Sequence, residues 1–182
     1  AHFSDEGQIQ ADYHKRFAFE LIQNADDAME GAGDKRKVRF ELRDGALLVA
    51  NTGRPIDKED VKALCTMSYT TKSADGEKRA SIGHKGRGFS SVLEITDQPQ
   101  VFSTGISFEF DKERSRREIE DLVETLDDTS MGEVDGIPLM RLPFSPQNTP
   151  DRVDELLDLG YNTVFRFDLK DEKVEQDVID SI

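Results

Sequence analysis

Apolar residues recur at helical spacing in the first part of the chain. Between Gln8 and Met29 they fall every three or four positions, which is the period of an amphipathic helix. The segment Gly31-Ala32-Gly33 follows directly, and glycine at this place favours helix termination. The pattern therefore predicts one long helix that ends close to residue 30.

Short apolar runs after this helix predict strands. Val38–Leu42 and Leu47–Ala50 are joined through Arg43-Asp44-Gly45, and Asp-Gly is a typical turn of a β-hairpin. Further strands are predicted over four later ranges: Gln100–Ser103, Ile106–Phe110, Ile137–Leu142 and Thr163–Leu169.

Helices are predicted between these strands. Asp57 is placed to cap a short helix that reaches Cys65, and the acidic side chains of Glu59 and Asp60 suit the positive end of its dipole. Three later segments are helix-compatible, namely Phe89–Leu93, Lys112–Leu126 and Asp151–Leu159. Helices and mostly antiparallel strands in this order predict a two-layer α+β sandwich.

The remaining segments bear on domain organisation. Thr66–Ala80 is polar, rich in lysine and short of large apolar residues, so we expect a mobile loop there. Residues 171–182 remain helix-like, and the chain shows neither an initiator Met nor a secretory leader. We therefore expect a fragment of a longer protein, with one domain over residues 1–170 and the start of a connecting helix over 171–182.

Composition narrows the class of protein. The 182 residues carry a formal net charge of -14, which disfavours binding to the phosphate backbone of nucleic acid unless a local basic patch is present. Cys65 is the single cysteine, so no internal disulfide can form. No apolar run approaches the roughly 20 residues that span a bilayer. We expect a soluble, cytoplasmic protein with no membrane contact.

One polar ridge runs beside the apolar face of the first helix. Glu20, Asn24 and Asp27 fall within about 60° of one another around the helix axis. Such a ridge can hold a ligand, and it is also a common place for solvated acidic residues.

A glycine-rich segment, Gly83-x-x-Gly86-x-Gly88, leads into a helix-compatible stretch. Backbone N–H groups at such a junction stabilise an anion such as a polyphosphate, and Lys85 and Arg87 add positive charge. The alternative is a glycine turn with two solvated basic residues. A dinucleotide-binding fingerprint is excluded, because no strand with a downstream ribose-binding acid frames the segment.

Asn51-Thr52-Gly53 follows a predicted strand, where a polar side chain can contact the edge of a base. Asparagine and glycine are also ordinary turn residues, so this motif alone does not decide between a turn and a site.

The order of the three motifs resembles the GHKL ATPases. The resemblance is carried by Glu20-Leu-Ile-Gln-Asn24-Ala-Asp-Asp27-Ala, by Asn51-Thr-Gly53, and by Ile-Gly83-His84-Lys85-Gly86-Arg87-Gly88-Phe89. Three further stretches look like the ATPase-like modules of sacsin-like proteins: Leu-Ile-Gln-Asn-Ala-Asp-Asp-Ala, Gly-Phe-Ser-Ser-Val-Leu-Glu-Ile-Thr-Asp-Gln-Pro and Thr163-Val-Phe-Arg-Phe-Asp-Leu. The resemblance covers residues 8 to about 170. It implies a Bergerat fold, a two-layer α/β sandwich whose mixed, mostly antiparallel sheet is covered by helices on one face.

The resemblance also implies a role for each matched residue of the first and third motifs. Glu20 would be the general base that activates water, and Asn24 would offer its amide oxygen to Mg²⁺. Asp27 would support the adenine and metal side of the site. Gly83, Gly86 and Gly88 would wrap the phosphates. The whole third motif would take part in binding ATP or ADP: Gly83, His84, Lys85, Gly86, Arg87, Gly88 and Phe89.

The second motif departs from the family pattern. Asn51 stands where most members have the Asp that accepts a hydrogen bond from the adenine amino group, and Pro55 replaces a glycine. An amide donates as well as accepts, so discrimination against guanine is less secure. Gly53 matches the family glycine, and Thr163 would touch adenine directly or through water. The loop over 68–80 corresponds to a lid, in which Lys72 contacts a phosphate or is solvated.

The resemblance therefore implies a Mg-dependent ATPase that hydrolyses ATP slowly, as a nucleotide-gated module of a larger chaperone-like or regulatory protein. The expected partners are the nucleotide, downstream domains of the parent chain and a second copy that dimerises on ATP binding. The alternatives are a non-hydrolysing nucleotide sensor and an acidic interaction module. A histidine kinase is disfavoured, because His14 has no helical hairpin before it.

Overall fold

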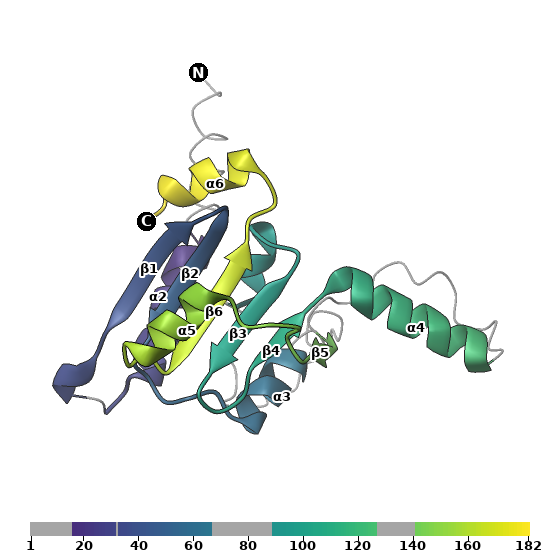
Figure 1. The fold of residues 1–182 in the computed structure, drawn as a ribbon, viewed down its shortest axis with the longest axis horizontal. Helices are drawn as coiled ribbons and strands as arrows, with labels where there is room; N and C mark the ends of the chain where they lie inside the picture. Colours follow the sequence, from purple (N-terminus) through teal and green to yellow (C-terminus); the bar gives the residue numbers. More distant parts are fainter. Residues whose placement is uncertain (1–15, 32, 67–88, 127–140) are drawn as a thin grey trace, which may run out of the picture.

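The computed structural model describes residues 16–31, 33–66, 89–126 and 141–182 (Figure 1). The helical elements are α2 (Arg16–Ala28), η1 (Gly33–Lys35), α3 (Lys58–Thr66), η3 (Phe89–Glu94), α4 (Lys112–Leu126), α5 (Asp151–Asp158) and α6 (Glu172–Ile179). The strands are β1 (Val38–Arg43), β2 (Ala46–Asn51), β3 (Pro99–Ser103), β4 (Phe108–Phe110), β5 (Pro143–Phe144) and β6 (Thr163–Asp168). Among these described elements, no helix has the length and apolar character needed to cross a membrane.

The strands form one antiparallel sheet in the order β1-β2-β6-β3-β4-β5. The last strand in the sequence, β6, therefore lies in the middle of the sheet, between β2 and β3. Its register places Thr163 opposite both Asn51 of β2 and Ser103 of β3. Three polar side chains from three strands thus meet at one end of the sheet.

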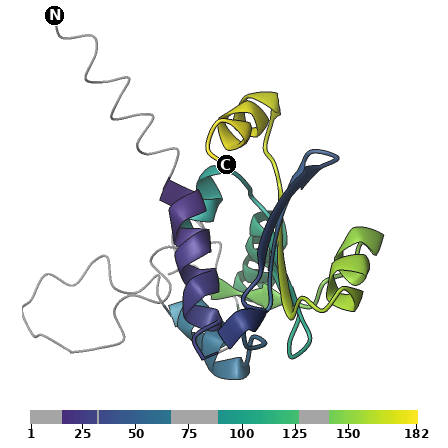
Figure 2. The same cartoon turned by 90° about the vertical axis from the view of Figure 1, so that its left-hand side faces the viewer.

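The main core lies between the sheet and α2. Alternating strand residues such as Val49, Val101 and Phe165 face this side and pack against Phe17 and Leu21 of the helix. Figure 2 shows α2 along this face, with α5 on the opposite face. The predicted α+β sandwich is therefore confirmed.

One detail of the expected fold is corrected by α5, because helices cover both faces of the sheet and not one. Val153 and Leu156 of α5 are fully buried against Leu48, Ala50 and Val164 in a second, smaller core. In the described residues every strand pair is antiparallel, whereas we expected a mixed, mostly antiparallel sheet.

The predicted hairpin turn and the predicted cap of α3 are both confirmed, and each depends on only a few consecutive residues. Asp44 and Gly45 both have positive φ, 52° and 71°, as a tight hairpin turn requires. Asp57 caps α3 as predicted, because its carboxylate accepts hydrogen bonds from the N–H groups of Glu59 and Asp60 at 2.9 and 3.0 Å.

The strand expected over Ile137–Leu142 falls largely outside the described residues. Its described end, at 141–142, is not a strand, and the observed strand is the two-residue β5 beyond it. Phe110 of β4 pairs with Pro143, which is tolerated because β5 is at the edge of the sheet.

The C-terminal helix α6 packs onto the main core through Val178, which is fully buried. Its expected role as a connecting helix stays a prediction. In contrast, α4 extends away from the sheet (Figure 1).

Candidate functional site

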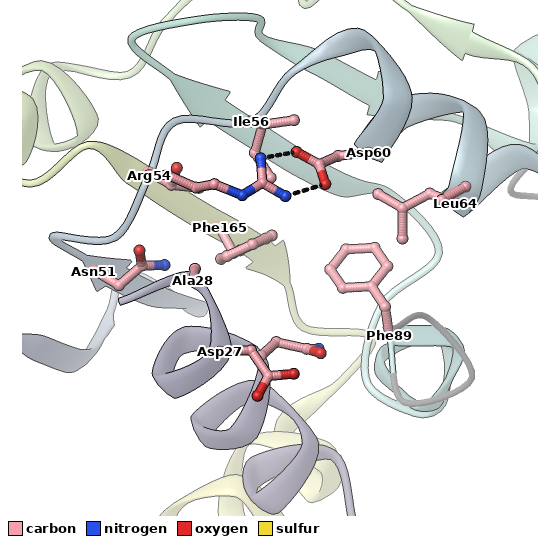
Figure 3. A pocket seen from close by; sticks show the side chains of 12 residues that line it. Asp27, Ala28, Asn51, Arg54, Ile56, Asp60, Leu64, Phe89 and Phe165 are labelled. Atoms are coloured by element: carbon pink, nitrogen blue, oxygen red, sulfur yellow. Dashed lines mark hydrogen bonds and ion pairs between the residues drawn. The ribbon is translucent and has the colours of Figure 1, made fainter. Parts of the chain in front are cut away.

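A cavity of about 200 Å³ lies between α2, α3 and the end of the sheet where Asn51 and Thr163 meet (Figure 3). Its lining combines polar groups with an apolar wall: Asn24, Asp27, Ala28, Asn51, Arg54, Ile56, Asp60, Ala63, Leu64, Phe89, Thr163 and Phe165. Five of the residues predicted from the sequence are therefore brought to one place, namely Asn24, Asp27, Asn51, Phe89 and Thr163.

The helix α2 contributes the polar ridge predicted from its spacing. Phe17, Leu21 and Ala25 are buried on one side of the helix, which turns Asn24 and Asp27 toward the cavity. Asn24 is half-buried and Asp27 is exposed. Glu20 lies one turn earlier, is half-buried, and is not among the residues that line the cavity.

The loop after β2 approaches α2 so closely that residue 53 must be glycine. A Cβ atom built at Gly53 would lie 2.7 Å from both the carbonyl carbon and the Cβ of Ala28. The neighbouring N–H of Arg54 donates a hydrogen bond to the Ala28 carbonyl oxygen at 2.9 Å. Gly53 itself does not line the cavity, so it acts here by joining the sheet to the end of α2.

Asn51 is buried at the end of β2, and its amide has a defined orientation. The side-chain oxygen accepts a hydrogen bond from the backbone N–H of Gly53 at 2.9 Å. A flipped amide would place the Asn51 NH₂ group against the Gly53 N–H, which are both donors. The hydrogen bond therefore fixes the oxygen toward Gly53 and the nitrogen away from it. Figure 3 shows the Asn51 nitrogen turned toward the cavity.

Thr163 lies opposite Asn51 on β6, with its hydroxyl in a hydrogen-bonded chain. The Thr163 hydroxyl donates to Ser103 Oγ at 3.2 Å, and the Ser103 hydroxyl in turn donates to the backbone oxygen of Asn162 at 3.1 Å. Ser103 Oγ also accepts from the N–H of Ile56 at 3.0 Å. The Thr163 hydroxyl therefore uses its proton in the hydrogen bond to Ser103. Its oxygen can still accept a hydrogen bond.

An ion pair between Arg54 and Asp60 borders the cavity on the side opposite Asp27 (Figure 3). Two guanidinium nitrogens of Arg54 donate to the two oxygens of Asp60 at 2.6 and 2.5 Å. These hydrogen bonds lower the pKa of Asp60, although partial burial opposes the shift. Sequence reasoning missed this pair, because Asp60 was assigned to the helix dipole and Arg54 had no assigned partner.

Apolar side chains form the remaining wall. Phe89 is buried, and its ring centroid lies 5.6 Å from that of Phe165 and 6.1 Å from that of Phe167. Leu64 of α3 and Ile56 also contribute to the lining. Phe89, which was predicted to bind the cofactor, contributes its ring to the apolar side of the cavity.

The expected phosphate-binding segment Gly83, His84, Lys85, Gly86, Arg87 and Gly88, and the lid residue Lys72, lie outside the described residues. Within the described residues, no group of three or more His, Cys, Asp or Glu side chains is placed to hold a metal ion. A cation bound by Asn24 would therefore need oxygen ligands from the nucleotide and water.

The size and chemistry of the cavity suit a planar heterocycle. A volume of about 200 Å³ is below the roughly 300–1,000 Å³ typical of cavities that enclose a drug-sized ligand. An apolar wall can pack against an aromatic ring, and the polar groups at one end can form hydrogen bonds with the donors and acceptors on the edge of the ring.

Comparison with known proteins finds two relationships. The family model described as "Sacsin domain" matches residues 7–181 of the chain. The Arabidopsis thaliana protein described as "Protein NO VEIN" is 36% identical over 95 residues. The match covers 52% of this chain and 3% of that much longer protein.

Proposed function

The chain belongs to the Sacsin domain family, and we propose that it binds a purine nucleoside triphosphate with Mg²⁺. ATP is the nucleotide that the resemblance to GHKL ATPases implies. The observation that carries the proposal is the cavity itself, because α2, β2 and β6 bring Asn24, Asn51 and Thr163 to the same lining.

The placement of these groups supports a base inside the cavity. Asn51 and Thr163 are buried at its polar end, where they can contact the edge of a ring. Phe89 and Phe165 supply an apolar wall for the ring face. Phe89 directly follows in the sequence the glycine-rich segment to which the family resemblance assigns the phosphates.

Magnesium fits the polar residues of α2. Asn24 and Asp27 lie on one ridge and offer the oxygen ligands that Mg²⁺ prefers. The chain has a formal net charge of -14, so a polyphosphate approaching it is repelled unless a cation offsets part of that charge. Bound Mg²⁺ would neutralise phosphate charge, while Asn24 and Asp27 would orient its hydration shell.

The presence of Glu20 at the matched position of the first motif favours slow hydrolysis, with a non-hydrolysing sensor as the second candidate function. Glu20 lies one turn from Asn24 and outside the cavity lining. It can act as a general base only on a water near the terminal phosphate, beyond the base-binding end of the site. We propose that lid closure, downstream domains and dimerisation complete the site within a larger chaperone-like or regulatory protein.

Calorimetric titration of ATP and ADP, with and without Mg²⁺, tests the binding proposal. Thr163→Val removes a cavity hydroxyl at nearly constant shape, and we expect it to change nucleotide affinity, because Thr163 lies at the end of the cavity where the base would bind. Asp27 lies on α2 and Asp158 is the last residue of α5, on the other face of the sheet. Asp27→Asn and Asp158→Asn therefore make the same charge change at the cavity and away from it. We expect Asp27→Asn to alter the Mg²⁺ dependence of binding and Asp158→Asn to leave it unchanged.

Absence of binding at millimolar nucleotide by the wild-type protein would overturn the proposal. For hydrolysis, phosphate release is compared between wild type and Glu20→Gln, which keeps the size of the side chain. Equal rates would remove Glu20 as general base and leave the sensor as the better description.

A further inference from the structure

The two polar groups at the end of the cavity present a defined pattern of one donor and one acceptor. The Asn51 oxygen is engaged by the N–H of Gly53 at 2.9 Å, and the amide nitrogen is turned into the cavity (Figure 3). Within the part of the chain that the structure describes, this nitrogen donates no hydrogen bond and is not sealed from the cavity. It is therefore a donor available to a ligand.

Thr163 provides the complementary acceptor beside it. Its proton is directed to Ser103 Oγ, and Ser103 passes its own proton to the Asn162 carbonyl. Asn51 and Thr163 are direct partners across β2 and β6. Side chains in such positions have Cβ atoms about 4.5–5.5 Å apart, so both can reach neighbouring atoms of one ring.

Purines fall into two classes by the order of donor and acceptor along the edge that carries position 6 and N1. Hypoxanthine and guanine present an acceptor at O6 and a donor at N1–H, and adenine presents the reverse, a donor at its 6-amino group and an acceptor at N1. A cavity with a donor at Asn51 and an acceptor at Thr163 matches the first edge. The second would set donor against donor and acceptor against acceptor.

We propose that the cavity selects purine nucleotides with a 6-oxo edge, so that inosine and guanosine triphosphates bind more tightly than ATP. This inference rests on the proposed function and changes the base that the family resemblance implies. Asn51 is the specificity-determining residue, and the N–H of Gly53 is the group that orients it.

An aspartate at this position would present a different group to the base. An aspartate could accept from Gly53 N–H with one oxygen and would turn a second acceptor, not a donor, into the cavity. The 6-amino group of adenine could then donate to it. Asn51→Asp is therefore expected to remove the preference for the 6-oxo edge with a change of one atom in the side chain, while Thr163 still favours N1–H.

The test is calorimetric titration of the 182-residue chain with ITP, GTP and ATP in the presence of Mg²⁺. ITP and ATP differ only at the 6-oxo and N1 edge, so their ratio isolates the proposed contact, and GTP adds the 2-amino group. We expect ITP to bind at least about tenfold more tightly than ATP, because a mismatched edge in a buried site forfeits one hydrogen bond or more.

Two variants extend the comparison. Asn51→Asp should remove most of the roughly tenfold ITP advantage, because the acceptor it presents matches the 6-amino group of adenine while Thr163 still matches N1–H of ITP. Thr163→Val should also reduce the ITP advantage, because it removes the acceptor for N1–H. Thermal unfolding of each variant verifies that it is folded.

Each outcome bears on a different claim. ATP binding as tightly as ITP in the wild type, or an unchanged ratio in folded Asn51→Asp, overturns the base assignment and leaves nucleotide binding intact. Failure of all three nucleotides to bind at millimolar concentration overturns the proposed function and, with it, the base assignment.

Discussion

Replacing Gly53 by alanine tests how tightly the loop after β2 is held against α2. The new methyl carbon would lie 2.7 Å from two carbon atoms of Ala28 and 2.8 Å from its carbonyl oxygen. Ordinary carbon contacts are at about 3.5–4.0 Å, so the loop and the helix end must separate by roughly 1 Å. The obstacle is largely backbone, which cannot turn aside as a flexible side chain would.

The expected cost follows from two contributions. Overpacking of a tight contact costs about 1–3 kcal/mol. Separation also weakens the hydrogen bond from Arg54 N–H to the Ala28 oxygen, which contributes about 1 kcal/mol. The free energy of unfolding should fall by about 2–4 kcal/mol, equivalent to a Tm lower by about 5–15 °C for a domain of this size.

Thermal and urea unfolding followed by circular dichroism measure this change. Gly33→Ala is the matched control, because it adds the same methyl group where no atom lies within 4 Å. Its positive φ of 58° carries a cost of about 1 kcal/mol for a residue other than glycine. Equal unfolding free energies for the two variants would refute the argument that backbone contact excludes a side chain at Gly53.

Three other predictions follow from contacts in the fold. The pKa values of Asp60 and Glu41 are lowered mainly by hydrogen bonds from Arg54 and Arg152, respectively. Their stabilisation is therefore present above the unfolded pKa values of about 4 and is lost as the pH falls through the folded values. Tm should decline between about pH 5 and pH 3, and the decline should be less steep in Arg152→Met. An identical decline in that variant would exclude a contribution of Glu41 to the pH dependence of stability. Phe89→Ala removes a buried ring that contacts two others, and chemical unfolding should show a loss of about 3–5 kcal/mol, whereas a loss below about 1 kcal/mol would contradict its place in the core. Burial raises the pKa of the Cys65 thiol, so a thiol reagent at pH 8 should react more slowly with the folded protein than with the protein in denaturant, and equal rates would show that the thiol is accessible.

Sequence reasoning succeeded where the determinants are local. The Asp44-Gly45 turn and the Asp57 cap each depend on a few consecutive residues, so their chemistry could be read directly. The amphipathic spacing of α2 likewise predicted that Asn24 and Asp27 would share a ridge beside the buried face.

Features that depend on tertiary pairing could not be read from local patterns. Val153 and Leu156 predict one apolar face on α5, but nothing in their spacing says which side of the sheet that face covers. The Arg54–Asp60 pair joins a loop to a helix at a separation of six residues, which matches no standard helical or strand periodicity. The meeting of Asn51 with Thr163 was inferred from family resemblance, because a pattern within either strand does not specify its neighbour.

The central position of β6 has a consequence for how the domain is made. On the ribosome, β1 and β2 emerge first and β3 and β4 later, and each pair can form a hairpin by itself. These hairpins have no common edge until the strand that begins at Thr163 has been synthesised and inserted between them. The polar end of the cavity includes Thr163, so it too is incomplete until then. A nascent chain that stops before β6 would therefore leave each hairpin without the strand that joins it to the other.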